Sequence, residues 1–200
     1  MLEIAELETR HVGPISMNVS GGECVAILGP SGSGKSLLLR AIADLDPNAG
    51  RVALNGQIRE EMPACEWRRK VAFVPAETGW WADRVSDHFA DTDDVGDLLA
   101  AMKLSDAMEW EVSRLSTGER HRLGIVRALQ TKPRALLLDE PTASLDGDMT
   151  TAVEELIWHL LAGDVSVLIV THDEEQARRI AGRSMRMSDG QLTPEAGAAS

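Results

Sequence analysis

GPSGSGKS, residues 29–36, is the stretch that decides the fold of this 200-residue chain. The apolar run 24–28 before it is typical of a buried strand, and the amphipathic run 35–45 after it is typical of a helix. Glycines in such a turn let successive backbone N–H groups face an anion, and the helix N-terminus adds its positive dipole end. The pattern G-x-x-x-x-G-K-[ST] in this context therefore predicts a phosphate-binding loop. We expect Lys35 to reach the β- and γ-phosphates of a nucleotide and the Ser36 hydroxyl to bind Mg²⁺.

A second apolar run, residues 135–139, ends in two carboxylates, Asp139 and Glu140, and is stopped by Pro141. A continuous hydrophobic run suits a central parallel strand that is buried on both faces. Because ligands of such sheets bind at the carboxyl ends of the strands, both acids should face the nucleotide. We expect Asp139 to belong to the Mg²⁺ shell and Glu140 to polarise the attacking water as general base.

The segment LSTGE, residues 115–119, stands at the start of a predicted helix, residues 118–130. Ser116 and Glu119 have the spacing of a capping box, which by itself only begins a helix. The segment comes shortly before the acidic strand end, and this position makes it a candidate for more than a cap.

Taken in order, these motifs resemble those of the ATP-binding subunits of ABC transporters, and the resemblance extends from Leu2 to about Leu192. Residues 29–36 resemble the Walker A motif, 115–119 the LSGGQ signature, 136–140 the Walker B motif, 144–146 the D-loop and 171–173 the switch-histidine loop.

The resemblance implies an ATPase that uses ATP and Mg²⁺ and works as a head-to-tail dimer, with the signature of one subunit facing the Walker A motif of the other. The Ser116 hydroxyl and the helix N-terminus at Gly118 suit a γ-phosphate. His172 would contact the γ-phosphate and orient the water, and a helix cap formed by Thr171 and Glu174 would hold it at the carboxyl edge of the sheet. The catalytic residues that the resemblance implies are Lys35, Glu140 and His172, with Ser36 and Asp139 at the metal. The nucleotide-binding residues that it implies are Gly29, Pro30, Ser31, Gly32, Ser33, Gly34, Lys35, Ser36, Leu115, Ser116, Thr117, Gly118, Glu119 and Asp146.

The alternation of short apolar runs with amphipathic stretches indicates an α/β fold. With the resemblance, the prediction is a P-loop NTPase of ABC type: a mostly parallel core sheet flanked by helices, an N-terminal antiparallel β-subdomain and a short helical subdomain at about 83–118. One domain is expected over residues 1–192, followed by a disordered tail at 193–200. Expected strands are residues 3–7, 15–19, 24–28, 51–54, 70–74, 135–139, 166–171 and 183–187; expected helices are 35–45, 95–102, 118–130, 149–161 and 174–181.

The bulk composition limits the partners. The formal net charge is -12, with 32 acidic residues against 20 Lys and Arg, which argues against nucleic acid because phosphate contacts need a basic face. No apolar run approaches the roughly 20 residues of a bilayer crossing. We therefore expect a soluble, cytoplasmic protein that is held at the inner face of the membrane by a separate permease.

Two positions depart from the family pattern. The glutamine that normally follows the strand at 71–74 is replaced by Ala76, which can bind neither Mg²⁺ nor water. Glu77 is the nearest polar side chain and is a hypothetical substitute at the metal, although neighbouring side chains on an extended strand point to opposite sides. The aromatic residue that stacks on adenine is also missing, and His11 is the only planar ring near its place.

The leading function is a transporter motor that couples ATP-driven dimerisation to a membrane permease. One alternative is a soluble ABC ATPase of DNA repair, translation or cofactor assembly; another is a catalytically silent cassette, which the presence of Glu140 and His172 opposes. The permease-contacting face should include residues 76–85, where Trp80 and Trp81 are adjacent. These tryptophans have two open interpretations, contact with a partner or packing of the small lobe.

Overall fold

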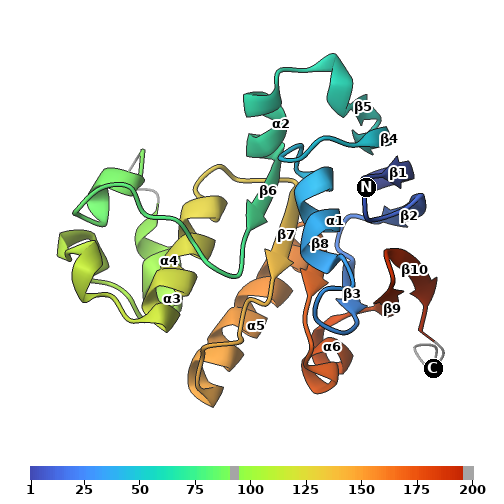
Figure 1. The fold of residues 1–200 in the computed structure, drawn as a ribbon. Coiled ribbons are helices and arrows are strands. Elements are labelled where there is room, and N and C mark those ends of the chain that lie inside the picture. Colours follow the sequence, from blue (N-terminus) through green and yellow to red (C-terminus); the bar gives the residue numbers. More distant parts are fainter. Residues whose placement is uncertain (91–94, 196–200) are drawn as a thin grey trace.

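The main sheet has six strands and carries the site at one edge. The computed structural model describes residues 1–90 and 95–195 and gives the strand order β10-β9-β3-β8-β7-β6 (Figure 1). All neighbours pair in parallel except β10, which is antiparallel to β9. The strands are β3 (Cys24–Leu28), β6 (Val71–Val74), β7 (Ala135–Asp139), β8 (Ser166–Val170), β9 (Arg183–Ser188) and β10 (Gln191–Pro194).

A second, antiparallel sheet is built from the N-terminal part of the chain. Its order is β2-β1-β4-β5, and it lies beside the main sheet, on the right in Figure 1. The predicted architecture, a mostly parallel core sheet with an antiparallel β-subdomain, is confirmed. The strands are β1 (Leu2–Glu8), β2 (Ile15–Val19), β4 (Ala49–Leu54) and β5 (Gln57–Ile58).

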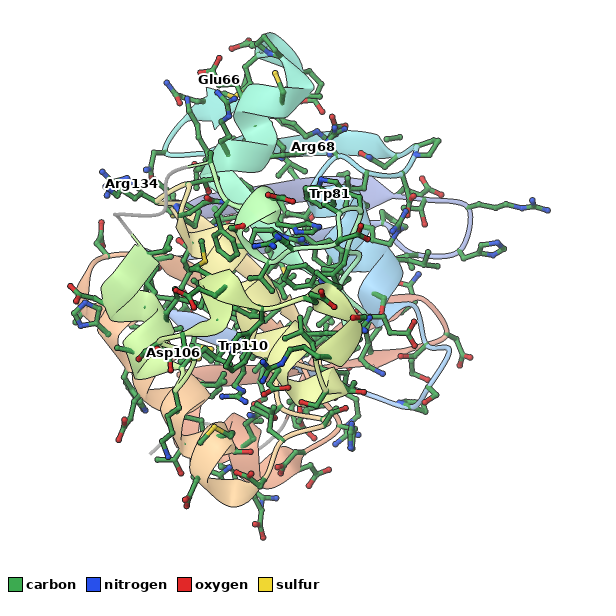
Figure 2. The ribbon with its side chains drawn as sticks, turned by 90° about the vertical axis from the view of Figure 1, so that its left-hand side faces the viewer. Glu66, Arg68, Trp81, Asp106, Trp110 and Arg134 are labelled. Carbon is green, nitrogen blue, oxygen red and sulfur yellow. The ribbon has the colours of Figure 1, made fainter. Side chains whose placement is uncertain are left out.

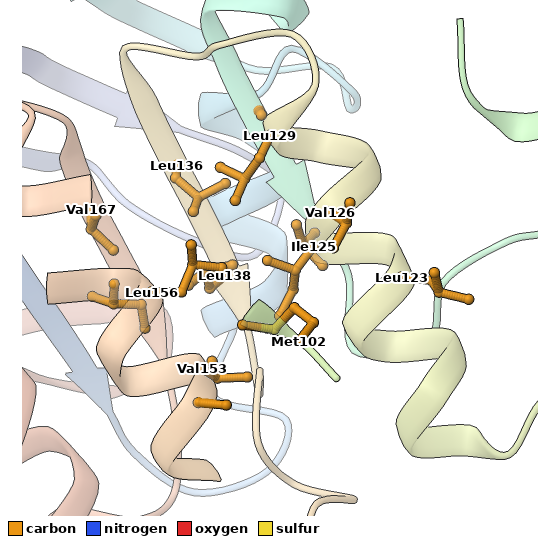
Figure 3. Packing of buried hydrophobic residues seen from close by; sticks show 14 of the residues in the cluster. Met102, Leu123, Ile125, Val126, Leu129, Leu136, Leu138, Val153, Leu156 and Val167 are labelled. Atoms are coloured by element: carbon orange, nitrogen blue, oxygen red, sulfur yellow. The ribbon is translucent and has the colours of Figure 1, made fainter. Parts of the chain in front are cut away.

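Helices cover the main sheet on both faces because successive side chains of a strand point to opposite sides. From β7, Ala135 and Leu137 pack with α1 and the antiparallel sheet, whereas Leu136 and Leu138 pack with α4 and α5. Figure 3 shows the second contact, in which Leu136 and Leu138 lie between Ile125 of α4 and side chains of α5. The helices are α1 (Lys35–Ile42), α4 (Thr117–Leu129), α5 (Gly147–Ala162) and α6 (Glu174–Ile180).

The predicted helical lobe consists of short turns around one α-helix, α3 (Gly96–Ala101). Among the described residues of the lobe, the 3₁₀ turns are η2 (Ser86–His88), η4 (Ala107–Glu109) and η5 (Val112–Arg114). Its two ends meet, since Val85 N–H donates to the Trp110 carbonyl at 3.0 Å and Val112 N–H donates to the Asp83 carbonyl at 2.7 Å. Within the predicted lobe, at about 83–118, residues 91–94 lie outside the described part of the chain.

Several predicted boundaries were wrong. The helix expected to reach residue 45 ends at Ile42, because the chain turns at Asp44 with a φ of 58°. The strand expected from residue 70 begins at Val71, because Lys70 ends an unpredicted helix, α2 (Ala64–Lys70). Strand β10 continues through Pro194, inside the predicted tail, and residues 196–200 lie outside the described residues. In the described ranges, no helix is both long enough and apolar enough to cross a membrane.

The unpredicted helix α2 is anchored by one tryptophan. Trp67 is fully buried, and its indole N–H donates to the Ile42 carbonyl at the end of α1 at 2.9 Å. Trp67 is the buried residue of this short helix, and Arg68 adds a hydrogen bond to the Asp44 carbonyl at 2.6 Å, so tertiary contacts hold α2 against the end of α1.

We expect Trp67→Phe to lower the free energy of unfolding by about 1–3 kcal/mol, because it leaves the Ile42 carbonyl without its donor and reduces the buried volume. Chemical denaturation measures the change. The matched control is Trp158→Phe, whose side chain is 51% exposed on α5 and should alter stability by less than about 0.5 kcal/mol. Equal effects of the two substitutions would contradict this anchoring role.

Candidate nucleotide-binding site

The carboxyl ends of β3, β6, β7 and β8 meet at one edge of the sheet, since these strands are parallel. A cavity of about 310 Å³ lies there. It brings together the glycine-rich loop, the acidic strand end and the alanine after β6, which the sequence separates by up to about a hundred residues. The lining residues are Ser31, Gly32, Gly34, Lys35, Ser36, Leu37, Ala76, Asp139, Glu140 and Val170.

The glycines of residues 29–36 are needed on the back of the loop. A Cβ atom on Gly29 (φ 149°) would lie 2.2 Å from the Met187 carbonyl oxygen. A Cβ atom on Gly34 (φ 106°) would lie 2.6 Å from Cγ2 of Val12. The loop therefore packs directly against β9 and the segment after β1, and its other side faces the cavity.

Lys35 lies in the mouth of this loop. Its side chain is buried, and Nζ donates to the carbonyl oxygens of Gly29 at 2.7 Å and Pro30 at 2.8 Å. The buried Ser33 hydroxyl has no hydrogen-bond partner among the described residues. An ammonium group, a spare hydroxyl and the N-terminus of α1 together form a pocket suited to phosphate oxygens.

The two acids after β7 have different surroundings. Asp139 is buried at the strand end, whereas Glu140 adopts a φ of 50°, an uncommon conformation for a non-glycine residue. The backbone N–H of Glu140 donates to the Val170 carbonyl at 2.8 Å, which fixes this turn to β8. Glu140 Oε2 accepts a hydrogen bond from Nδ1–H of His172 at 2.8 Å. The structure thus brings together the two residues that the sequence predicts as base and switch histidine.

The cap of α6 differs from the prediction. The N-cap residue is Asp173, whose Oδ1 accepts from the backbone N–H groups of Glu175 at 2.9 Å and Gln176 at 3.0 Å. Thr171 instead accepts from the Asp173 N–H at 3.1 Å, so the predicted cap by Thr171 and Glu174 was wrong. The carboxylate of Asp173 is the stronger acceptor, and the two caps in series hold His172 between them.

The segment 115–119 forms the predicted capping box. Ser116 Oγ accepts from the Glu119 N–H at 3.2 Å, and Glu119 Oε2 accepts from the Ser116 N–H at 2.8 Å. This backbone hydrogen bond is the main cause that lowers the pKa of Glu119 below its usual value. Among the described residues, none of 115–119 lines the cavity, and in Figure 1 strands β6 and β7 separate α4 from α1.

The predicted D-loop lies beside this segment in the same chain. Asp146 caps α5, because its Oδ1 accepts from the Met149 N–H at 2.9 Å. A Cβ atom on Gly118 would lie 3.1 Å from both Leu145 Cδ2 and the Ser144 carbonyl oxygen. The start of α4 and residues 144–146 therefore form one continuous surface.

Of the two departures from the family pattern, one lies at the cavity and the other lies beside the phosphate-binding loop. Ala76 lines it, whereas Glu77 is exposed and is not among the described residues of the lining. His11 is exposed, and its neighbour Val12 contacts the phosphate-binding loop at Gly34.

Sequence reasoning missed His121. This histidine lies on the buried face of α4, and its Nδ1–H donates to the Ala76 carbonyl at 3.2 Å. Burial is the main cause that lowers the pKa of His121, against the opposing effects of the Ala76 carbonyl and the charge of Asp139. The only signal in the sequence is a histidine at a position where the helical pattern requires burial.

The donor set suits a hard cation. Ser36 and Asp139 both line the cavity, and they offer a hydroxyl and a carboxylate oxygen. The described residues contain no cluster of three or more His, Cys, Asp or Glu that could hold a metal ion without other ligands. Mg²⁺ fits such a site, because it keeps several waters and binds phosphate oxygens together with few protein ligands.

The fold and this cavity define a P-loop nucleotide-binding domain. Residues 12–143 match the family model described as "ABC transporter", and the chain belongs to this family of ATP-binding proteins. A solved structure of the "ATP binding subunit of ABC transporter" has a TM-score of 0.86 at 22% identity, covering 96% of this chain and 89% of that one. The predicted ABC type of the fold is thereby confirmed.

Curated relatives carry names of both import and export proteins. An "Fe(3+) ions import ATP-binding protein FbpC" of Streptomyces coelicolor is 36% identical over 89% of this chain, which spans 55% of that relative. "Phosphate import ATP-binding protein PstB 2" of Natronomonas pharaonis is 34% identical over 92% of this chain and 74% of the relative. "Macrolide export ATP-binding/permease protein MacB" of Brucella abortus is 35% identical over 94% of this chain, which spans 32% of that protein.

We expect Lys35→Ala to weaken ATP binding about ten- to hundredfold, as for the loss of a charged hydrogen-bonding group. Isothermal titration calorimetry measures the affinity. Lys103→Ala, which removes an exposed lysine of the helical lobe, serves as control and should leave affinity unchanged. ATP affinity and turnover that survive Lys35→Ala would rule out the assigned phosphate site.

Proposed function

We propose that this chain is the ATP-hydrolysing motor of an ABC transporter, coupling ATP-driven dimerisation to a membrane permease. The observation that carries the proposal is the cavity in which Lys35, Asp139 and Glu140 converge, with His172 hydrogen-bonded to Glu140. The import and export relatives favour this function over repair, translation or cofactor assembly.

In the proposed mechanism, Lys35 exchanges the carbonyls of Gly29 and Pro30 for phosphate oxygens when ATP enters. Glu140 then accepts a proton from the attacking water, and its hydrogen bond to His172 holds the carboxylate in orientation. His172 is 72% exposed, so its ring is accessible to the γ-phosphate. Ser36 and Asp139 would hold Mg²⁺, which neutralises charge on the β- and γ-phosphates.

The proposed active form is a head-to-tail dimer. Ser116 and Gly118 begin a helix of 13 residues, whose N-terminal N–H groups suit an anion, yet they lie apart from the cavity of their own chain. A second copy turned head to tail would bring this helix start to the phosphates. Asp146, which adjoins Gly118 through residues 144 and 145, would lie in the same interface.

The permease-contacting face in this proposal includes residues 76–85. Trp80 is partly buried and packs against the core, whereas Trp81 is 72% exposed (Figure 2). Trp80 therefore suits packing of the small lobe, whereas Trp81 suits contact with a partner. A groove of about 430 Å³ begins there, and its acidic side chains, Asp83 and Glu111, favour a basic segment of the permease. We further propose that the protein lies at the cytoplasmic face of the membrane, as expected of a motor subunit that is held there by its permease.

We expect Glu140→Gln to keep ATP binding and to slow hydrolysis by about 10²–10⁴-fold, because the general base is lost. The ATP-bound dimer should then accumulate, since hydrolysis no longer opens it. Phosphate release and light scattering with ATP and Mg²⁺ measure the two effects. Undiminished turnover, or a monomer under these conditions, would count against the mechanism.

The hypothesis that Glu77 replaces the missing glutamine at Mg²⁺ requires this exposed carboxylate to turn toward the cavity in the closed dimer. If it does, Glu77→Ala should shift the Mg²⁺ concentration needed for half-maximal ATPase activity upward, and Ala76→Gln should lower it. ATPase rates over a Mg²⁺ titration, with the permease present, distinguish the variants. An unchanged Mg²⁺ dependence in Glu77→Ala would leave Glu77 as a solvated side chain.

A further inference from the structure

The segment 76–81, between the cavity and the proposed permease face, is fastened to one face of α4. Ala76 lines the cavity at one end of this segment, and Trp81 is exposed at the other. Ala76 has no polar side-chain group, so this position cannot make the side-chain contact with nucleotide-bound Mg²⁺ that a glutamine would make. The side-chain contacts of the segment with α4 therefore decide how it responds to ATP.

The first attachment is His121. Its ring is 6% exposed, and Nδ1–H donates to the Ala76 carbonyl at 3.2 Å. A donor at Nδ1 leaves Nε2 of the neutral ring as an acceptor, and this atom is buried without a hydrogen-bond partner among the described residues. A buried polar atom without a partner destabilises the fold, so apolar packing alone would favour another residue here.

The second attachment is Thr78. Its hydroxyl donates to the Arg120 carbonyl at 3.1 Å and accepts from the Trp80 indole N–H at 3.1 Å. The methyl group of Thr78 lies on Gly124, where an added Cβ atom would come within 2.3 Å of it. Close approach of the segment to the helix thus requires glycine at position 124.

The third attachment is Arg127. Its Nη1 donates to the Gly79 carbonyl at 3.0 Å. Its guanidinium carbon also lies 4.7 Å from the ring centroid of Trp80 and 4.9 Å from that of Trp81, within the range of cation–π contacts. The exposed end of the segment is therefore held by the same helix as its cavity end.

The attachment points on α4, residues 120, 121, 124 and 127, have the spacing of a single helical face. The same helix begins at Thr117, with Ser116 as its cap. A displacement of this helix start is therefore transmitted through a rigid element to the whole segment.

We propose that α4 takes over the link that the missing glutamine would provide, and that His121 is the positioning residue that joins segment 76–81 to it. This inference rests on the proposed function. When Ser116 and the start of α4 engage the γ-phosphate of the partner copy, the helix moves the segment with it. The segment then reports the state of the partner's nucleotide and not that of Mg²⁺ in its own cavity.

Hydrogen–deuterium exchange of residues 76–84, with and without ATP and Mg²⁺, tests the link. The full-length Glu140→Gln chain supplies the trapped ATP state. In this background ATP should slow exchange of the segment about three- to tenfold, because engagement of α4 at the interface restrains local opening of the segment attached to it. His121→Leu should abolish the ATP-dependent change while ATP binding and dimerisation persist.

Three further variants define the result. His121→Asn should restore the change, because its amide nitrogen replaces Nδ1 as donor to the Ala76 carbonyl. His159→Leu, at an exposed histidine of α5, should behave as the parent. Thr78→Val removes the donor to Arg120 with little change of shape and should reduce the change even if His121→Leu fails to fold.

An ATP-dependent change that persists in both His121→Leu and Thr78→Val would overturn the proposal, as would its loss in His159→Leu. ATP binding and dimerisation without any change in the segment would also overturn it while leaving the proposed function intact. Failure of the parent chain to bind ATP would reject the proposed function, and this link with it.

Discussion

Parallel pairing of β3, β8 and β7 is the constraint on which the rest of the site depends. It aligns the carboxyl ends of strands that are distant in sequence, so the phosphate-binding loop after β3 and the acids after β7 open into one cavity. The pairing also fixes the Glu140 backbone to Val170, which carries the carboxylate toward His172. β3, β7 and β8 are buried on both faces, as is typical of parallel strands covered by helices, and this burial stabilises the centre of the sheet.

The nucleotide-binding cavity is a small region of positive potential in a strongly acidic protein. Its net charge of -12 would repel a nucleotide at long range, and screening limits that repulsion to about a Debye length in salt. Within the cavity, Lys35 and backbone N–H groups at the start of α1 can donate hydrogen bonds to a phosphate. At this short distance the hydrogen bonds outweigh the long-range repulsion by the net charge. The negative charge of Asp139 opposes phosphate binding unless a cation neutralises it. The attraction of the cavity for a nucleotide therefore depends on the metal.

In the proposed function, helix α4 both presents its N-terminus to an anion and holds segment 76–81. Its N-terminus is capped by Ser116 and Glu119 and is left free for an anion, while its middle holds segment 76–81 through His121 and Arg127. Core packing against β7 limits bending of the helix, as Leu123, Ile125 and Val126 are buried. In the proposed dimer, signals between the subunit interface and the permease-contacting face therefore need no separate pathway.

The sequence by itself determined the features that depend on neighbouring residues: the loop at 29–36, the strand that ends at Asp139, the capping box of Ser116 and the α/β class. These follow from local patterns of glycine, apolar and capping residues. Only the tertiary structure decided the hydrogen bond of His172 to Glu140, the anchoring of α2 by Trp67 and the contact of His121 with Ala76. Each of these joins residues at least 25 positions apart, and the folding of the sheet, which no local pattern encodes, brings them together.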